Sequence, residues 1–453
     1  MSLWSSNEIA AATGGSAAEG FAVNGVAFDS REVGPGDLFV AMPGSATDGH
    51  RFVERAFAAG AAGALVSQPV QGPHVLVPNT AAALEALGGA ARARTGARIA
   101  GVTGSVGKTG VKEALAAALA RRPDTRVHRS VKSYNNHTGV PLSLARMPAD
   151  TEFGVFEMGM NHAGEINALT RQVRPQVALI TAIAPAHIEN LGSLEAIADA
   201  KAEIFEGLEP GGTAIVPADS PYCERLLAAA ERYAGQCLTF GRAASAQVRA
   251  REVVPTENGT LVSAVLPGAE LTFTVGAAGE HWVSNALAVL AAVSALGGDV
   301  ALAGLALAEL DGLQGRGARV TVTVGDGTAT LIDESYNANP ASMAATLAVL
   351  GREPGRKLAV LGEMYELGAH GPDAHRALAE PVLAAGVDGL MLVGEGMTPL
   401  ADALRGRLAV EQVRDAGEAT DGLRALLRPG DSVLVKGSNG VGLGRLVAAL
   451  GER

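Results

Sequence analysis

Short apolar runs separated by turn residues mark the first 80 residues of the chain. Four such runs, bounded by Gly, Pro, Asn, Asp or Ser, favour strands. They cover residues 22–30, 37–44, 62–68 and 74–79. Between the second and third runs, residues 50–60 place apolar side chains at helical spacing. The pattern predicts a small α/β domain over residues 1–80.

The pattern then changes to a repeated alternation of strand and helix. Residues 79–96 have the character of a linking helix. Four apolar runs follow, each leading into an alanine-rich helical stretch, at residues 97–104, 151–159, 176–185 and 212–218. This alternation is typical of a parallel sheet covered by helices. We expect this central domain to span residues 81–313.

A third domain is predicted over residues 314–453. Further strands alternate with helices to the end of the chain, at residues 330–335, 357–363, 389–395 and 431–438. The fold class is therefore α/β with three domains, and a chain of 453 residues is long enough to require several cores.

Composition narrows the class of protein. No segment approaches the roughly 20 apolar residues of a membrane span, and the first residues lack the basic start and apolar run of a signal peptide, so we expect a cytosolic protein. Cys223 and Cys237 fit neither a disulfide framework nor paired metal ligands, and we interpret them as free thiols. A net charge of −11 argues against non-specific binding of nucleic acid. An anionic ligand must therefore meet a local cluster of donors.

Lysine is used sparingly, with six lysines beside 30 arginines. Lys201 is notable because a helix beginning after Ser193 would place it on the same stripe as Ile197, Ile204 and Phe205. Burying an isolated ammonium costs several kcal/mol, so such a lysine reaches out to solvent, pairs with a carboxylate, loses its proton or is chemically modified.

A glycine-rich loop between a predicted strand and a predicted helix carries the strongest chemical signal. The loop comprises Gly104, Ser105, Val106, Gly107, Lys108 and Thr109. Its backbone NH groups can wrap a phosphate chain, its lysine can reach the β and γ phosphates, and its threonine can bind Mg²⁺. Val102 stands where the strict motif has its first glycine. ATP is the predicted ligand.

Two further strands end in side chains suited to Mg²⁺, Glu157 and His187. At a strand end either could equally be a structural group, but beside a nucleotide loop at the same sheet edge both become candidate ligands. The amides of Asn135 and Asn136, in the loop 133–141, could cap the backbone or bind a polar substrate. In the segment 333–342, the sequence Asn-Ala-Asn-Pro could be part of a site or a turn and nothing more.

Several segments together resemble the Mur ligases: GVTGSVGKT, SYNNHTGVPL, FEMGMNHAGEI, APAHIENLGS, AKAEIF, GEHWVSNALA, DESYNANPAS, LGEMYELG and VKGSNG. The order of the segments is that of the family, and the match extends to the N-terminal segment beginning FDSREVGPGDLFV. The resemblance covers essentially the whole chain.

The resemblance implies a UDP-substrate domain, a P-loop ATPase domain and a Rossmann-like C-terminal domain. It also implies ATP-driven addition of D-Ala-D-Ala to UDP-MurNAc-tripeptide through an acyl phosphate, in peptidoglycan precursor synthesis, by an enzyme expected to be a monomer. Lys108, Glu157, His187 and Lys201 are the implied catalytic residues. Thr109, Glu157, His187 and a carbamylated Lys201 are the implied ligands of Mg²⁺, with two metal sites.

By the same resemblance, Asn285 and His281 face the adenine, Arg316 reaches the ATP phosphates and Asp333 is a carboxylate on the nucleotide side. The implied substrate contacts are Ser30 and Arg31 for UDP, Asn135 and Asn136, and Asn337 and Asn339 at the third-domain face of the cleft. Four positions depart from the common family pattern: Gly110, Trp282, Glu334 and Asn439.

Two other functions remain open from the sequence. A sibling ligase that adds a single amino acid, including a polyglutamate ligase, shares the P-loop domain. A nucleotide-binding module without catalytic activity would keep the loop but not the reaction.

Overall fold

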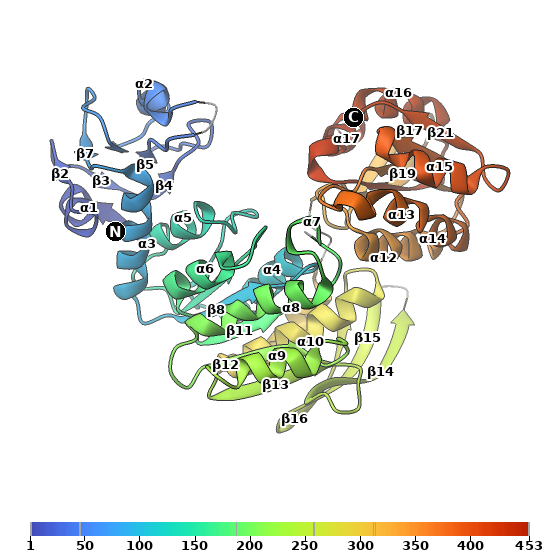
Figure 1. Ribbon diagram of the computed structural model, residues 1–453, viewed down its shortest axis with the longest axis horizontal. Coiled ribbons are helices and arrows are strands. Elements are labelled where there is room, and N and C mark those ends of the chain that lie inside the picture. Colours follow the sequence, from blue (N-terminus) through green and yellow to red (C-terminus); the bar gives the residue numbers. More distant parts are fainter. Residues whose placement is uncertain are drawn as a thin grey trace.

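The computed structural model describes residues 2–44, 47–186, 188–256, 259–310, 312 and 314–451. Three α/β domains follow one another along the chain, each with its own main sheet. In Figure 1 the first and third domains lie on either side of the molecule, and the middle domain lies between and below them. The three-domain α/β fold predicted from the sequence is confirmed.

The first domain contains a five-stranded sheet in the order β2-β7-β6-β5-β4, parallel except for β2. Its strands are β2 (Ser16–Ala17), β4 (Gly25–Ala27), β5 (Asp37–Val40), β6 (Gly63–Val66) and β7 (His74–Leu76). The antiparallel pair β1 (Trp4–Ser5) and β3 (Ala22–Val23) stands apart from this sheet. The helices are α1 (Ser6–Thr13), α2 (Val53–Ala58) and the linking helix α3 (Thr80–Ala93).

The middle domain contains a nine-stranded sheet in the order β16-β15-β14-β13-β12-β11-β8-β10-β9. The strands from β9 to β14 are parallel, whereas β14, β15 and β16 form an antiparallel extension. The bounds are β8 (Arg98–Thr103), β9 (Val127–Arg129), β10 (Phe153–Glu157), β11 (Val177–Ile180), β12 (Thr213–Pro217), β13 (Gln236–Gly241), β14 (Val248–Thr256), β15 (Gly259–Leu266) and β16 (Ala269–Val275).

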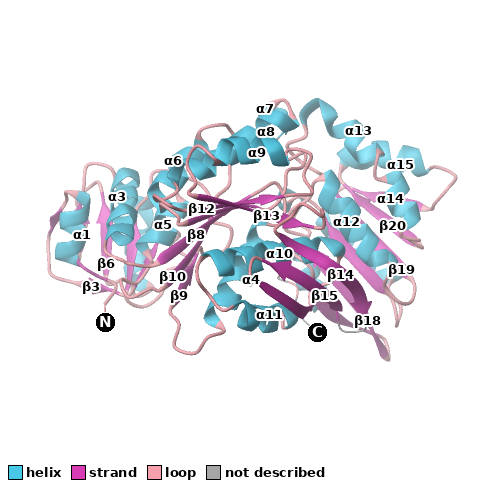
Figure 2. Cartoon of the chain, turned by 90° about the horizontal axis from the view of Figure 1, so that it is seen from below, coloured by secondary structure: helices cyan, strands magenta, loops and turns pink. Residues whose placement is uncertain are grey.

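Helices cover both faces of the parallel part of this sheet (Figure 2). One face packs against α4 (Lys108–Ala120), α10 (Glu280–Ala295) and α11 (Val300–Ala308). The other packs against α5 (Gly139–Ala145), α6 (Glu165–Val173), α8 (Leu194–Ala202) and α9 (Cys223–Ala230). Successive residues of a strand point to opposite faces, so Ile99 lies in one core and Ala100 in the other.

The third domain contains a six-stranded sheet in the order β17-β18-β22-β19-β20-β21, parallel except for β17. Its strands are β17 (Ala318–Val324), β18 (Gly327–Glu334), β19 (Lys357–Gly362), β20 (Gly389–Val393), β21 (Val410–Val413) and β22 (Ser432–Lys436). Its helices are α12 (Pro340–Gly351), α13 (Gly371–Arg376), α14 (Ala379–Ala384), α15 (Thr398–Leu404), α16 (Ala416–Leu426) and α17 (Gly444–Gly451).

The helix around Lys201 is shorter than the sequence predicts. Ser193 caps α8 by accepting a hydrogen bond from the Ala196 NH, as expected, but α8 ends at Ala202. A 3-10 helix (Glu203–Gly207) continues the chain and still buries Ile204 and Phe205. The tighter turn keeps the apolar side chains in the core after the α-helical register has ended.

Two composition-based expectations can be compared with the fold. Cys223 and Cys237 are free thiols, as predicted. Among the residues described, none of the helices combines the length and apolar character that crossing a lipid bilayer requires. The domain boundaries near residues 80 and 313 stay predictions, and residue 313 lies outside the described residues.

Candidate functional site

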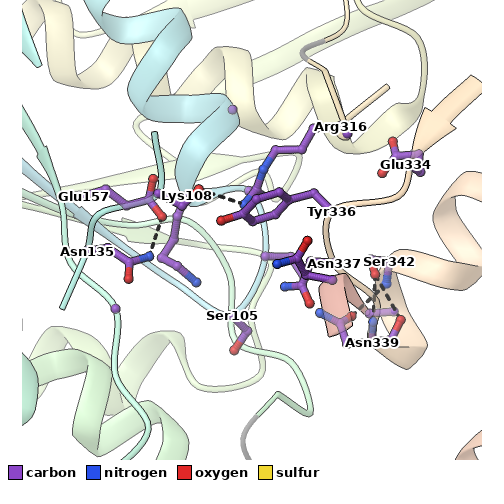
Figure 3. Close-up of a pocket in the computed structure, with 18 of the residues that line it drawn as sticks. Ser105, Lys108, Asn135, Glu157, Arg316, Glu334, Tyr336, Asn337, Asn339 and Ser342 are labelled. Atoms are coloured by element: carbon purple, nitrogen blue, oxygen red, sulfur yellow. Dashed lines mark hydrogen bonds between the residues drawn. The ribbon is translucent and has the colours of Figure 1, made fainter. Parts of the chain in front are cut away.

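A cavity of about 600 Å³ lies between the middle and third domains. Figure 3 shows Lys108, Glu157 and Asn135 on one side of it, with Arg316 and Tyr336 opposite them. Twelve of the residues proposed from the sequence line this cavity: Ser105, Val106, Gly107, Lys108, Asn135, Asn136, Glu157, His281, Asn285, Arg316, Asn337 and Asn339. The strand ends of two domains therefore face one space.

The glycine-rich loop connects β8 to α4 and forms the floor of the cavity. Gly107 precedes the helix with φ of 85°, and a Cβ there would lie 2.9 Å from Oδ1 of Asn285, so both backbone and space require glycine. Lys108 Nζ donates to the Gly104 carbonyl at 2.7 Å. The first NH groups of α4 have no acceptor within the helix, so they are available to an anion, as phosphate binding requires.

Charges from both domains act on Lys108. Burial lowers the pKa of its amine, Glu157 and Glu366 oppose that change, and Arg316 adds to it. A neighbouring phosphate chain would stabilise the protonated form, because an anion close to an ammonium favours its charge. The site therefore matches a polyanionic ligand.

Glu157 ends β10 and is 1% exposed. Its Oε2 accepts a hydrogen bond from Thr109 Oγ1 at 2.8 Å, and its Oε1 accepts one from Asn135 Nδ2 at 2.8 Å. A carboxylate and a hydroxyl side by side at the phosphate loop are hard oxygen donors, the type that Mg²⁺ takes alongside water and phosphate. These two residues fit Mg²⁺. His187, the third proposed ligand, lies outside the described residues.

The two asparagines of the 133–141 loop have different roles. Asn136 Oδ1 accepts hydrogen bonds from the Thr138 and Gly139 NH groups, so it caps the turn that leads into α5. Asn135 instead points at Glu157. The sequence left open whether these amides cap the backbone or bind a polar substrate. Asn136 caps the backbone, whereas the Asn135 amide is held at the wall of the cavity.

Arg316 reaches across from the third-domain side. Its Nη2 donates to Ser133 Oγ at 3.4 Å, and its guanidinium lies 4.4 Å from the ring centroid of Tyr336. Asp333 does not line the cavity; its Oδ2 accepts the Gly315 NH at 2.7 Å and its Oδ1 accepts the Ser335 hydroxyl at 2.6 Å. Asp333 therefore holds the turn that carries Arg316.

The carboxylate of this strand end that does face the cavity is Glu334. It pairs with Lys436 at 3.2 Å, and Lys436 also donates to the Asn337 carbonyl at 2.9 Å. Asn339 caps α12 by accepting from the Ser342 NH, in a reciprocal pair with the Ser342 hydroxyl. The NANP turn is thus a helix start whose asparagines also line the cavity.

His281, Trp282 and Asn285 lie at the start of α10 and form another wall. Burial lowers the pKa of His281, Glu334 raises it and Lys436 lowers it further. The Trp282 ring packs on α4 at Gly110. A Cβ added at Gly110 would lie only 3.0 Å from this ring. Two of the departures from the family pattern, Gly110 and Trp282, are therefore in contact.

Three further proposed residues, Lys201, Ser30 and Arg31, do not line the cavity. Lys201 is 1% exposed on α8 and is not among the described residues that line the cavity, although the charge of Lys108 acts on it. Ser30 is buried in the first domain, and Arg31 is exposed there, paired with Asp29 at 2.6 Å.

Some residues that line the cavity were not proposed from the sequence. Tyr336 and Glu366 line it, as does Ser133. Tyr336 lies inside the segment 333–342, whose asparagines were proposed as site residues. The aromatic residue between them could have been proposed on the same ground. Nothing in the local pattern around Glu366 marks it, because its relation to Lys108 comes only from the fold.

Three family profiles match the chain. They are "Mur ligase family, catalytic domain" over residues 22–94, "Mur ligase middle domain" over residues 102–293 and "Mur ligase, glutamate ligase domain" over residues 318–439. The chain is also 34% identical over 440 residues to the UDP-N-acetylmuramoyl-tripeptide–D-alanyl-D-alanine ligase of Bacillus subtilis, covering 95% of this chain and 93% of that one.

Solved structures agree with this similarity. MurF from Acinetobacter baumannii superposes with a TM-score of 0.85 at 30% identity, covering 99% of both chains. MurF ligase from Thermotoga maritima, solved in complex with ADP, superposes with a TM-score of 0.77 at 26% identity, covering 95% of this chain and 97% of that one. The chain therefore belongs to the Mur ligase family, in the group of the UDP-N-acetylmuramoyl-tripeptide–D-alanyl-D-alanine ligases.

Proposed function

We propose that the protein is an ATP-dependent amide ligase that joins D-Ala-D-Ala to UDP-MurNAc-tripeptide. The observation that carries this proposal is the convergence of Lys108 and Arg316, from either side of one cavity, on the space above the glycine-rich loop. The relatives named above support the identity of the two substrates. The ADP complex of the Thermotoga maritima relative supports use of ATP.

The first chemical step activates a poor electrophile. An oxygen of the tripeptide's terminal carboxylate attacks the γ-phosphorus of ATP, the bond from that phosphorus to the β,γ-bridging oxygen breaks, and an acyl phosphate and ADP form. Phosphoryl transfer between anions depends on neutralising and aligning charge. Lys108 and Arg316 supply fixed positive charge for this step. Mg²⁺ held by Thr109 and Glu157 would add further charge neutralisation when bound.

The second step forms the amide. The neutral amine of D-Ala-D-Ala attacks the acyl carbon, phosphate leaves with the electron pair of the C–O bond, and the nitrogen loses a proton. The mouth of the cavity on the third domain offers Glu334, Tyr336 and Asn337 to the incoming dipeptide. Because these groups come from the opposite domain, the cavity can hold both reactants at once.

Finer parts of the proposal concern metal, modification and assembly. We propose that Lys201 is carbamylated and, with Glu157 and His187, takes part in a second Mg²⁺ site. Ser30 and Arg31 remain the proposed UDP contacts, and Asn285 and His281 the proposed adenine contacts. Boundaries near residues 80 and 313 and a monomeric state belong to the same proposal.

The test is release of phosphate with defined substrate pairs. UDP-MurNAc-tripeptide with D-Ala-D-Ala should stimulate release and give the ligated product, whereas the tripeptide with single amino acids should not. Lys108→Ala should lower acyl phosphate formation in a single turnover by roughly 10²–10³-fold, because one fixed charge at the transferring phosphoryl group is lost.

Lys357→Ala is the matched control, since Lys357 is a lysine of the third domain that does not line the cavity. It should keep normal turnover. Stimulation by a single amino acid would replace the proposal with the sibling ligase, and near-normal turnover of Lys108→Ala would remove the glycine-rich loop from the reaction.

A further inference from the structure

Lys112 is a fully buried lysine that the proposed reaction does not use. It lies on α4 one helical turn after Lys108, is 0% exposed and is not among the described residues that line the cavity. Its ammonium donates to two backbone carbonyls, that of Ser130 at 3.1 Å and that of Lys132 at 2.5 Å. Both acceptors belong to one short segment.

That segment, residues 130–136, brings several side chains to the site. Ser133 Oγ lies 3.4 Å from Thr109 Oγ1 and accepts from Arg316, and Asn135 donates to Glu157. Two backbone bonds hold the segment against the sheet, from the Ser130 NH to the Val155 carbonyl and from the Gly159 NH to the Asn135 carbonyl, and the Ser130 hydroxyl accepts a third bond from the Glu157 NH at 3.0 Å. Between these attachments the chain passes through Lys132, whose φ is 51°.

Carboxylates compensate the charge of Lys112. Glu113 lies 3.0 Å from its amine, and Glu157 Oε2 lies 3.9 Å away. A buried ammonium is stable only when paired and hydrogen-bonded, and here two backbone carbonyls and two carboxylates do this. A chain with 30 arginines places a lysine here, where a compact ammonium meets acceptors on several sides.

We propose that Lys112 is a positioning residue, which fixes the segment 130–136 so that Ser133 and Asn135 meet Thr109 and Glu157 at the phosphate loop. Lys112 does not line the cavity in which nucleotide and peptide are proposed to bind. It acts through the backbone of the segment. The first turn of α4 continues from the phosphate loop, and Lys112 on the next turn binds the segment that faces this loop. This role rests on the proposed ligase function of the cavity.

Lys112→Met tests the proposal, because methionine fills similar space but donates no hydrogen bond. Losing the charge-assisted bonds should raise amide hydrogen exchange in residues 130–136 roughly tenfold, while α10 exchanges as before. The dissociation constant for an ATP analogue should stay within about twofold, whereas the KM for UDP-MurNAc-tripeptide should rise about tenfold. Lys112→Gln, which keeps one donor, should give intermediate values.

Arg121→Met is the control, since it removes a positive charge from the far end of α4, where Arg121 pairs with Glu309 and not with the segment. Its exchange and KM values should match the unchanged protein. Faster exchange spread equally over the middle domain would show a purely structural role and overturn the proposal, as would unchanged exchange in the segment. If ligation itself fails in the unchanged protein, hydrogen exchange and ATP-analogue binding still decide the role of Lys112.

Discussion

At the residue scale, Lys201 is a lysine in a buried position, where a charged ammonium would lose the stabilisation it has in water. Burial lowers its pKa well below the ordinary 10.5, and the charge of Lys108 lowers it further. Burial and Lys108 are the influences on this amine, and among the described residues no carboxylate pairs with it, so the pairing alternative is not seen there. A lowered pKa favours the neutral amine, which can attack CO₂ and lose a proton to give a carbamate.

Lys201→Ala should therefore lose nearly all ligation, and bicarbonate or a short carboxylate should restore part of it by filling the vacated space with an anion. Lys201→Arg should stay inactive, because a guanidinium keeps the charge but cannot form the carbamate. Carbon-13 NMR with labelled bicarbonate gives a second measurement, in which a carbamate signal of the unchanged protein should be absent from Lys201→Arg. An active Lys201→Arg would refute the modification.

Where a local pattern exists, the sequence predicted residues that the structure places at the cavity, while their roles stay predictions. The glycine-rich loop and Glu157 follow from strand, turn and helix order, and both lie at the cavity. It could not show that Glu334 pairs with Lys436, because that contact joins strands 102 residues apart, nor that Asp333 turns inward to hold the turn at residue 315. Only the sheet order brings β18 and β22 together.

At the element scale, the crossing of α4 and α10 shapes one wall of the site. Gly110 lies inside α4, and its missing side chain leaves the space that the Trp282 ring uses. Trp282 belongs to α10, and Asn285 of the same helix lies beside Gly107 of the phosphate loop. The separation of these helices, and so the width of the wall, depends on both residues.

Gly110→Thr should force the helices apart and lower the free energy of unfolding by about 1–3 kcal/mol, with weaker binding of an ATP analogue. Adding Trp282→Asn should recover much of both losses, because the smaller side chain yields the space. A thermal melt and a binding titration of the two single variants and the double variant measure this coupling. Gly89→Thr is the control, since a side chain there meets nothing within 4 Å. Strictly additive effects would show that the two positions do not act as a pair.

Sequence pattern predicted the parallel strands better than the antiparallel ones. β8, β10, β11 and β12 are short apolar runs buried on both faces, and all four lie within the predicted ranges. The extension β14 to β16 was not assigned, because its alternating half-buried pattern gives a weaker apolar signal. The end of α8 was also missed, since a 3-10 turn preserves burial while changing the spacing.

At the scale of the whole molecule, the segment 130–136 meets all three domains. Glu32 of the first domain accepts hydrogen bonds from Tyr134 at 3.0 Å and from Lys132. Ser133 accepts one from Arg316 on the third-domain side. A substrate that lies along this segment would therefore contact the first domain at one end and the third domain at the other. Such shared contacts make the relative position of the domains part of the reaction.

ATP should draw the third domain toward the middle one, because Arg316 and the phosphates of a bound nucleotide attract one another across the cavity. Small-angle scattering should show a smaller radius of gyration with a non-hydrolysable ATP analogue than without it. Arg316→Met should still bind the analogue through the glycine-rich loop, more weakly, but should not contract. Arg319→Met is the matched control, because Arg319 pairs with Glu353 inside the third domain and should leave the contraction intact. Contraction of Arg316→Met equal to that of the unchanged protein, with binding confirmed, would assign closure to other contacts and leave Arg316 without this role.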